Sequence, residues 1–210
     1  MTKKKTGGGA RARIAAGAIA LVAWAGRAIQ FRATLEGAGA GSIAATLWVL
    51  LRFFTVLANL IVACVFTGVA AGSERAAGPR LLAGVTMTIG LVGVVYGLLL
   101  QGLLELSGGA ALADFLLHKA TPVLVALYWL VFVQKGAVRA RDPWAWTIFP
   151  VAYLGYALVR GAAEGRYAYP FIDVAKLGGA QVAVNAVLIG AGFLAAGFAM
   201  RWVDGRLGRG

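Results

Sequence analysis

The chain has 210 residues, of which 60% are hydrophobic and 13% are charged, and its mean hydropathy is +0.81. This composition excludes a water-soluble globular protein and is typical of a polytopic membrane protein. The formal net charge of +12 does not indicate a nucleic-acid-binding protein, because the basic residues lie in tails and loops between apolar segments. We expect anionic membrane lipids, and no nucleic acid, to meet these charges.

Apolar segments of membrane-spanning length occupy most of the chain. The first follows a run of basic residues and is expected to be a retained signal anchor, with a cleaved signal peptide as the alternative. The predicted transmembrane helices cover about residues 14–30, 44–71, 80–104, 110–134, 143–161 and 177–200. We therefore predict an all-α fold, a six-transmembrane-helix bundle at 14–200 between basic cytoplasmic tails at 1–13 and 201–210.

The distribution of basic residues predicts the orientation of this bundle. The tails and loops assigned to the cytoplasm contain Lys3, Lys4, Lys5, Arg11, Arg13, Arg75, Arg80, Lys135, Arg139, Arg141, Arg201, Arg206 and Arg209. Those assigned to the outer side contain Arg27, Arg32, Arg160, Arg166 and Lys176. By the positive-inside rule, both termini are expected in the cytoplasm of a multi-pass protein of the cell (plasma) membrane.

Polar residues in three of these segments are predicted to form one layer. Thr55, His118 and Asn185 each lie roughly one helical turn to the outer side of the midpoint of their segment. The tyrosines near the same level are Tyr96, Tyr153 and Tyr156. A polar layer displaced toward one leaflet suggests a cavity, because polar side chains in a membrane generally face the bundle interior or a site.

The second predicted helix contributes three polar residues, Arg52, Thr55 and Asn59, at i, i+3 and i+7. In a continuous helix this spacing places all three on one face, which should point into the bundle. The alternative is structural, with Thr55 bonded to its own helix and Asn59 joining two helices. A guanidinium inside an apolar segment is costly unless it snorkels, pairs or binds a ligand, so Arg52 is a candidate binding residue.

His118 is the only histidine of the chain, so base chemistry near neutral pH depends on it. Asp114 lies four residues before it, where a carboxylate can accept an imidazole N–H and fix the orientation of a general base. The alternative makes Asp114 a charge near a helix N-terminus and His118 a hydrogen-bonded residue of the bundle. One histidine, scattered carboxylates and the single Cys64 indicate no metal site, no disulfide within the chain and no cofactor.

Four landmarks occur in order along the chain: Arg52-Phe53-Phe54-Thr55, His118 shortly before Pro122, Asp142-Pro143-Trp144-Ala145-Trp146, and Tyr169-Pro170-Phe171-Ile172-Asp173. Over about residues 14–200, this order resembles the prokaryotic six-helix relatives of the androgen-induced, FAR-17a-like membrane proteins. Animal members of that family are multi-pass threonine hydrolases that cleave fatty acid esters of hydroxy fatty acids. The resemblance implies a threonine nucleophile at Thr55 and a histidine base at His118.

The resemblance therefore implies a lipid-ester hydrolase that acts through an acyl-threonine, with Asp114 orienting His118. The residues expected to bind the substrate or its oxyanion are Arg52, Asn59, Asn185, Tyr153, Tyr156 and Arg160.

Two alternatives remain open. One is a transporter or binding protein for an anionic or lipidic small molecule, with Arg52 as the counter-charge. The other is a non-catalytic bundle. Membrane lipids or an acyl ester are the expected partners, and protein partners are left open.

Overall fold

The computed structural model describes residues 9–37 and 41–209. Within these residues the regular elements are all helices, which confirms the predicted all-helical class. The helices are α1 (Ala10–Gly37), α2 (Ile43–Leu50), α3 (Phe54–Ala70), α4 (Pro79–Val95), α5 (Gly108–Phe115), α6 (Thr121–Phe132), α7 (Asp142–Glu164) and α8 (Val174–Leu207). Three short elements join them: the π-helical turns η1 (Tyr96–Leu100) and η2 (Leu116–Ala120), and the 3₁₀ turn η3 (Pro170–Ile172). The tail residues Lys3, Lys4 and Lys5 lie outside the described residues.

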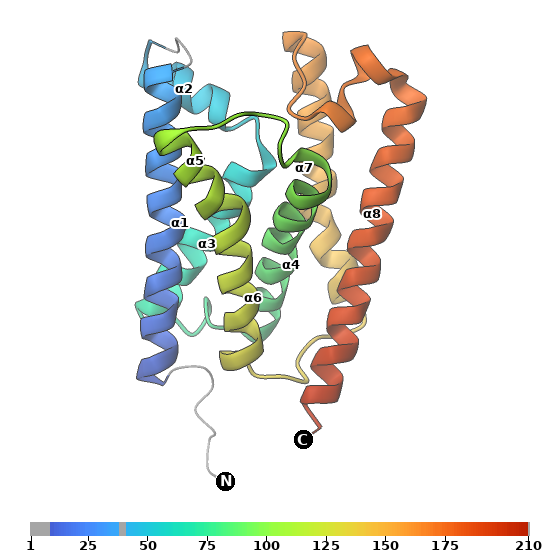
Figure 1. The fold of residues 1–210 in the computed structure, drawn as a ribbon. Coiled ribbons are helices and arrows are strands. Elements are labelled where there is room, and N and C mark those ends of the chain that lie inside the picture. The colour runs from blue at the N-terminus through green and yellow to red at the C-terminus, as the bar shows by residue number, and fades with distance from the viewer. Residues whose placement is uncertain (1–8, 38–40, 210) are drawn as a thin grey trace.

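The longer helices stand side by side in one bundle, with α1 beginning and α8 ending at the same end, and the short α2 runs across the other end (Figure 1). Helix α4 is central and contacts α3, α6, α7 and α8. Helices α1 and α3 pack through the fully buried side chains of Ala16, Ala23, Ala58 and Ala63. Small side chains allow two helix backbones to approach closely in a membrane. This packing fixes α3, the helix that carries Thr55.

Four stretches of helix are long and apolar enough to cross a membrane, or five if the bent pair α2–α3 counts as one span. The four are α1, Pro79–Leu100, Gly108–Phe132 and α8. The predicted fifth segment, 143–161, lies within α7, which is not among these spans because its tryptophans, tyrosines, prolines and Arg160 lower its hydropathy. The structure therefore supports a multi-pass membrane protein, and the count of six spans stays a prediction.

The prediction of one continuous helix over 44–71 is wrong. The chain forms two helices there, α2 and α3, whose axes differ by 98° at a break between Leu50 and Phe54. Ser42 starts the first of them by accepting a hydrogen bond from the backbone N–H of Ala45 at 3.2 Å. The residues on both sides of Arg52 are apolar, so the average hydropathy of the segment did not reveal the break.

The other predicted segments differ from the structure mainly at their ends. The first and last predicted segments, 14–30 and 177–200, lie inside the longer helices α1 and α8. The third, 80–104, continues past the π turn η1, and the fourth, 110–134, contains the π turn η2. Both π turns contribute residues to the candidate site, Tyr96 from η1 and His118 from η2.

Candidate active site

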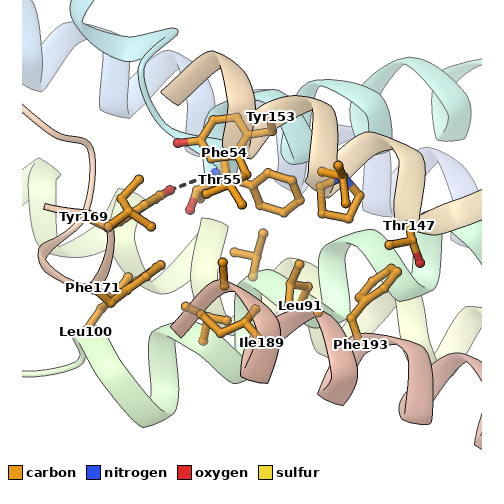
Figure 2. A pocket seen from close by; sticks show the side chains of 18 residues that line it. Phe54, Thr55, Leu91, Leu100, Thr147, Tyr153, Tyr169, Phe171, Ile189 and Phe193 are labelled. Carbon is orange, nitrogen blue, oxygen red and sulfur yellow. Dashed lines mark hydrogen bonds between the residues drawn. The ribbon is translucent and has the colours of Figure 1, made fainter. Parts of the chain in front are cut away.

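Thr55 lies in the first turn of α3, directly after the break, and is 7% exposed. The backbone N–H groups of a helix's first turn have no partner within the helix. That of Thr55 points to the hydroxyl oxygen of Tyr169 at 3.4 Å, as the dashed line in Figure 2 shows. The break thus presents the Thr55 side chain at the positive end of a helix dipole, beside a tyrosine from a distant loop.

Side chains of α7 donate hydrogen bonds to backbone carbonyl groups that lack a helical partner at the break. The hydrogen bonds run from Arg160 to the carbonyl of Trp48 (2.6 Å), from Tyr156 to Leu51 (3.2 Å) and from Tyr153 to Arg52 (2.7 Å). Unpaired carbonyl groups are expensive in a membrane, and irregular backbone is tolerated there only when protein or water satisfies it. Three residues that the sequence analysis assigned to substrate binding therefore contact the backbone of the break.

The side chain of Arg52 forms an ion pair with Glu164 at the end of α7. Glu164 also accepts a hydrogen bond from Nε of Arg160 at 2.7 Å, so the carboxylate joins two guanidinium groups. The prediction that Arg52, Thr55 and Asn59 lie on one face of a continuous helix is wrong, because Arg52 precedes the first turn of α3. Of the possibilities that the sequence left open for Arg52, the structure shows pairing.

His118 lies in the π turn η2, and its Nε2 is 3.2 Å from the Thr55 hydroxyl oxygen. Its Nδ1 is 3.0 Å from a carboxylate oxygen of Asp114 and 3.1 Å from the carbonyl oxygen of the same residue. Both neighbours of Nδ1 are acceptors, so in the neutral ring Nδ1 carries the proton and donates it. Nε2 is then the free acceptor that faces the Thr55 hydroxyl.

Tyr96 supports this arrangement in two ways. Its hydroxyl donates to the second carboxylate oxygen of Asp114 at 2.5 Å, and its ring stacks on the His118 ring with centroids 4.3 Å apart. Tyr96 begins η1 and His118 lies in η2, so each partner sits in a π-helical turn. Such turns occur often at functional sites. The sequence predicted Tyr96 near the level of His118, which this stacking confirms, and predicted no role for it.

Asn59 is fully buried and ties α3 to the segment that carries His118. Its amide nitrogen donates to the carbonyl of Thr55 at 2.9 Å and to the carbonyl of Leu117 at 3.2 Å. The side chain thereby bridges the backbone at Thr55 and the backbone next to His118. This is the helix-joining role that the sequence analysis gave as its alternative.

Two cavities meet at Thr55, and Thr55, Leu100 and Tyr169 line both of them. The larger, of about 560 Å³, contains His118 and Asp114 together with Gln30 and Thr34 of α1. The smaller, of about 120 Å³, is apolar, and Figure 2 shows the side chains around it. Volumes of a few hundred Å³ are typical of small-molecule sites.

The remaining candidate residues lie apart from the pair of Thr55 and His118. The Asn185 amide donates to the carbonyl of Phe171 at 2.9 Å, and Asn185 lines a groove between α4 and α8 that adjoins the small cavity. The Tyr153 ring lines the small cavity although its hydroxyl is used at the break. No group of three or more His, Cys, Asp or Glu side chains within residues 9–37 and 41–209 is placed to bind a metal ion.

The geometry can therefore support nucleophilic chemistry: a hydroxyl, an imidazole and a carboxylate follow one another within hydrogen-bonding distance beside a cavity. A tyrosine that the sequence analysis had not assigned supports both the imidazole and the carboxylate. Comparisons of the chain with protein-family models, with curated proteins and with solved structures give no match.

Proposed function

We propose that the protein is an intramembrane hydrolase of lipid esters, with Thr55 as nucleophile and His118 as general base. The observation that supports this most directly is the 3.2 Å contact between the Thr55 hydroxyl and Nε2 of His118, with Asp114 on the opposite nitrogen. This is the order of groups found in nucleophile–base–carboxylate triads, which are recognised by geometry and not by fold. Membership in the FAR-17a-like family is part of the same proposal.

In this mechanism Nε2 of His118 takes the proton of the Thr55 hydroxyl while the oxygen attacks the ester carbonyl carbon. The tetrahedral intermediate collapses when the bond to the alcohol oxygen breaks and His118 gives its proton to that oxygen. An acyl-threonine and a free alcohol result. His118 then takes a proton from water, which attacks the acyl-threonine, and the carboxylic acid leaves as the Thr55 hydroxyl is restored.

The donor that we propose for the oxyanion is the Tyr169 hydroxyl, which lies beside Thr55 and lines both cavities. The Tyr169 oxygen accepts from the Thr55 N–H, so its own proton is free to donate. The amides of Asn59 and Asn185 and the Arg52 guanidinium, which the sequence analysis had considered as donors, bind other groups. A fixed donor to an oxyanion contributes about 2.7–4 kcal/mol to the stability of a transition state.

The proposal places this site in a six-span protein of the plasma membrane with both termini in the cytoplasm. The cavity of about 560 Å³ is lined by residues of α2, α5 and the loops near them, at the end of the bundle opposite the start of α1 (Figure 1). With the predicted orientation this end faces outward, and water reaches Thr55 from the outer side.

A binding protein that uses Arg52 as counter-charge has less support, because Glu164 already pairs with Arg52.

The test is labelling of purified protein in detergent by a fluorophosphonate probe, combined with hydrolysis of long-chain 4-nitrophenyl esters. Thr55→Ala and His118→Ala are each expected to abolish labelling and to lower kcat by about 10³-fold or more. Thr67→Ala is the matched control on the same helix, because the Thr67 hydroxyl bonds to the carbonyl of Ala63 away from both cavities. Full labelling of either site variant would contradict the mechanism and leave the non-catalytic bundle.

A further inference from the structure

The small cavity next to Thr55 has a predominantly apolar lining. Its walls come mainly from α4, α7 and α8, and Figure 2 shows Leu91, Ile189 and Phe193 among the side chains that surround it. The few polar groups in the lining away from Thr55 are engaged elsewhere: Thr147 donates to the carbonyl of Pro143 and Tyr153 to that of Arg52. Among residues 9–37 and 41–209, none that lines this cavity is charged. The small cavity is therefore suited to binding a hydrocarbon chain.

A larger groove of about 930 Å³ adjoins this cavity along the seam between α4 and α8. The residues that line both are Leu91, Val95, Phe171, Ile189 and Phe193. Other side chains of the groove are exposed on the surface of the bundle, among them Leu98 at 78% and Leu188 at 66%. Exposed leucines on apolar helices face the lipid tails in a membrane. The apolar route from Thr55 thus leads toward the hydrocarbon of the bilayer.

The position of His118 determines which part of an ester lies on this route. His118 must deliver its proton to the alcohol oxygen, so the alcohol part has to lie on the His118 side of Thr55. His118 lines the cavity of about 560 Å³ and does not line the small apolar one. The acyl chain extends from the other side of the carbonyl carbon, which is the side of the small cavity.

We infer that the small cavity and the α4–α8 groove form the binding site for the acyl chain, which enters sideways from the membrane. The alcohol part of the ester occupies the cavity that contains His118, Gln30 and Thr34. The inference rests on the proposed function and adds to it the direction in which the substrate lies. Acyl-chain selectivity is then determined by residues of α4, α7 and α8, and alcohol selectivity by residues of α1 and α5.

The first experiment uses photoaffinity labelling of Thr55→Ala protein, which cannot turn the ester over. One probe is methyl palmitate with a diazirine near the methyl end of its acyl chain, and the other is hexadecyl acetate with a diazirine in its alcohol chain. The acyl-tagged probe is expected to label peptides from α4 and α8, and the alcohol-tagged probe peptides from α1 and α5. Equal or exchanged labelling by the two probes would overturn the assignment, whether or not the wild type hydrolyses esters.

The second experiment narrows the small cavity. Gly190 of α8 lines it, and a Cβ atom at this position meets no atom within 4 Å, so Gly190→Leu places new carbon in the open space. The ratio of kcat/KM for the 4-nitrophenyl hexadecanoate to that for the butanoate is expected to fall about tenfold. Selectivity for the alcohol, measured with hexadecyl against methyl butanoate, stays unchanged.

Gly205→Leu is the matched control on the same helix, because its Cβ also meets no atom within 4 Å and Gly205 lines none of the three cavities. It is expected to leave both selectivities at the wild-type value. A change of alcohol selectivity in Gly190→Leu, with acyl selectivity unchanged, would reverse the assignment. If the wild type hydrolyses no ester, the proposed function fails, and the labelling pattern of the two probes still decides where the acyl chain binds.

Discussion

At the level of single residues, the candidate site depends on which nitrogen of His118 holds the proton. Nδ1 faces two oxygens of Asp114, and Tyr96 donates to the remaining carboxylate oxygen of the same side chain. This chain of hydrogen bonds leaves Nε2 unprotonated toward Thr55. In the proposed mechanism, Asp114 and Tyr96 are therefore positioning residues, which act only through His118.

Substitution of Asp114 tests this positioning role. Asp114→Asn preserves the shape of the side chain, but its amide can present an N–H to Nδ1 and so favour the wrong tautomer. We expect kcat for ester hydrolysis to fall about 10²- to 10⁴-fold with little change in KM. The measurement is steady-state kinetics in detergent, with the thermal stability of each variant measured in parallel. A change confined to KM would assign Asp114 to substrate binding instead.

Tyr96→Phe separates the two contacts of Tyr96. The phenylalanine ring retains the stacking on His118 and loses only the hydrogen bond to Asp114. We expect a loss of about tenfold in kcat, smaller than that of Asp114→Asn, because one oxygen of the carboxylate still holds Nδ1. Tyr128→Phe is the control, since the Tyr128 ring packs on Phe66 and Phe132 away from the site. Wild-type kcat in Tyr96→Phe would show that the hydrogen bond has no part in orienting His118.

Residue type and spacing single out His118 and Asp114, whereas depth in the predicted helices groups Thr55 with His118 and the family resemblance implies its role. His118 has no competing histidine, Asp114 lies one turn before it, and the polar layer expected for Thr55 and His118 is a 3.2 Å contact in the structure. Their catalytic roles stay predictions. The role of Tyr96 was not predictable, because it depends on π turns that leave no mark in the apolar pattern.

At the level of elements, the break between α2 and α3 determines the surroundings of Thr55. In a continuous helix the Thr55 N–H would donate to a backbone carbonyl of the preceding turn. At the break it donates to the Tyr169 hydroxyl instead. The partners of the freed carbonyl groups come from α7, roughly a hundred residues further along the chain. Such long-range contacts explain why the sequence analysis expected one helix and assigned Tyr153, Tyr156 and Arg160 to the substrate.

Tyr153→Phe tests whether the break is held by these contacts. The variant keeps the packing of the ring on Phe54, at 5.0 Å between centroids, and leaves the Arg52 carbonyl without its donor. We expect Tm in detergent to fall by about 2–6 °C and labelling of Thr55 by the fluorophosphonate probe to slow. Tyr167→Phe is the matched control, because the Tyr167 ring packs on Gly161 and its hydroxyl has no hydrogen bond to the residues described. Equal Tm values for both variants would show that the hydroxyl contact does not stabilise the break.

At the level of the whole molecule, two loops that the sequence analysis assigned to the cytoplasm lie at the end of the bundle opposite the candidate site. The basic loops between α3 and α4 and between α6 and α7 lie near the end at which α1 begins (Figure 1). The cavity with His118 opens among α2, α5 and the loop after η1, at the other end. The fold class follows from composition, because the apolar segments dominate the chain. The side of the membrane that each end faces is predicted from the basic residues of the tails and loops, and labelling experiments can test this orientation.

Single cysteines at the two ends measure this orientation. In a Cys64→Ser background, Ser107→Cys reports on the loop before α5 and Ser73→Cys on the loop after α3, and both serines are exposed. The positive-inside rule predicts that a membrane-impermeant maleimide labels Ser107→Cys in intact cells and Ser73→Cys only after permeabilisation. The two substitutions are equally conservative, so a difference in labelling reports the side of the membrane. The reverse pattern would place the His118 cavity on the cytoplasmic side, and water for the hydrolysis of the acyl-threonine would then come from the cytoplasm.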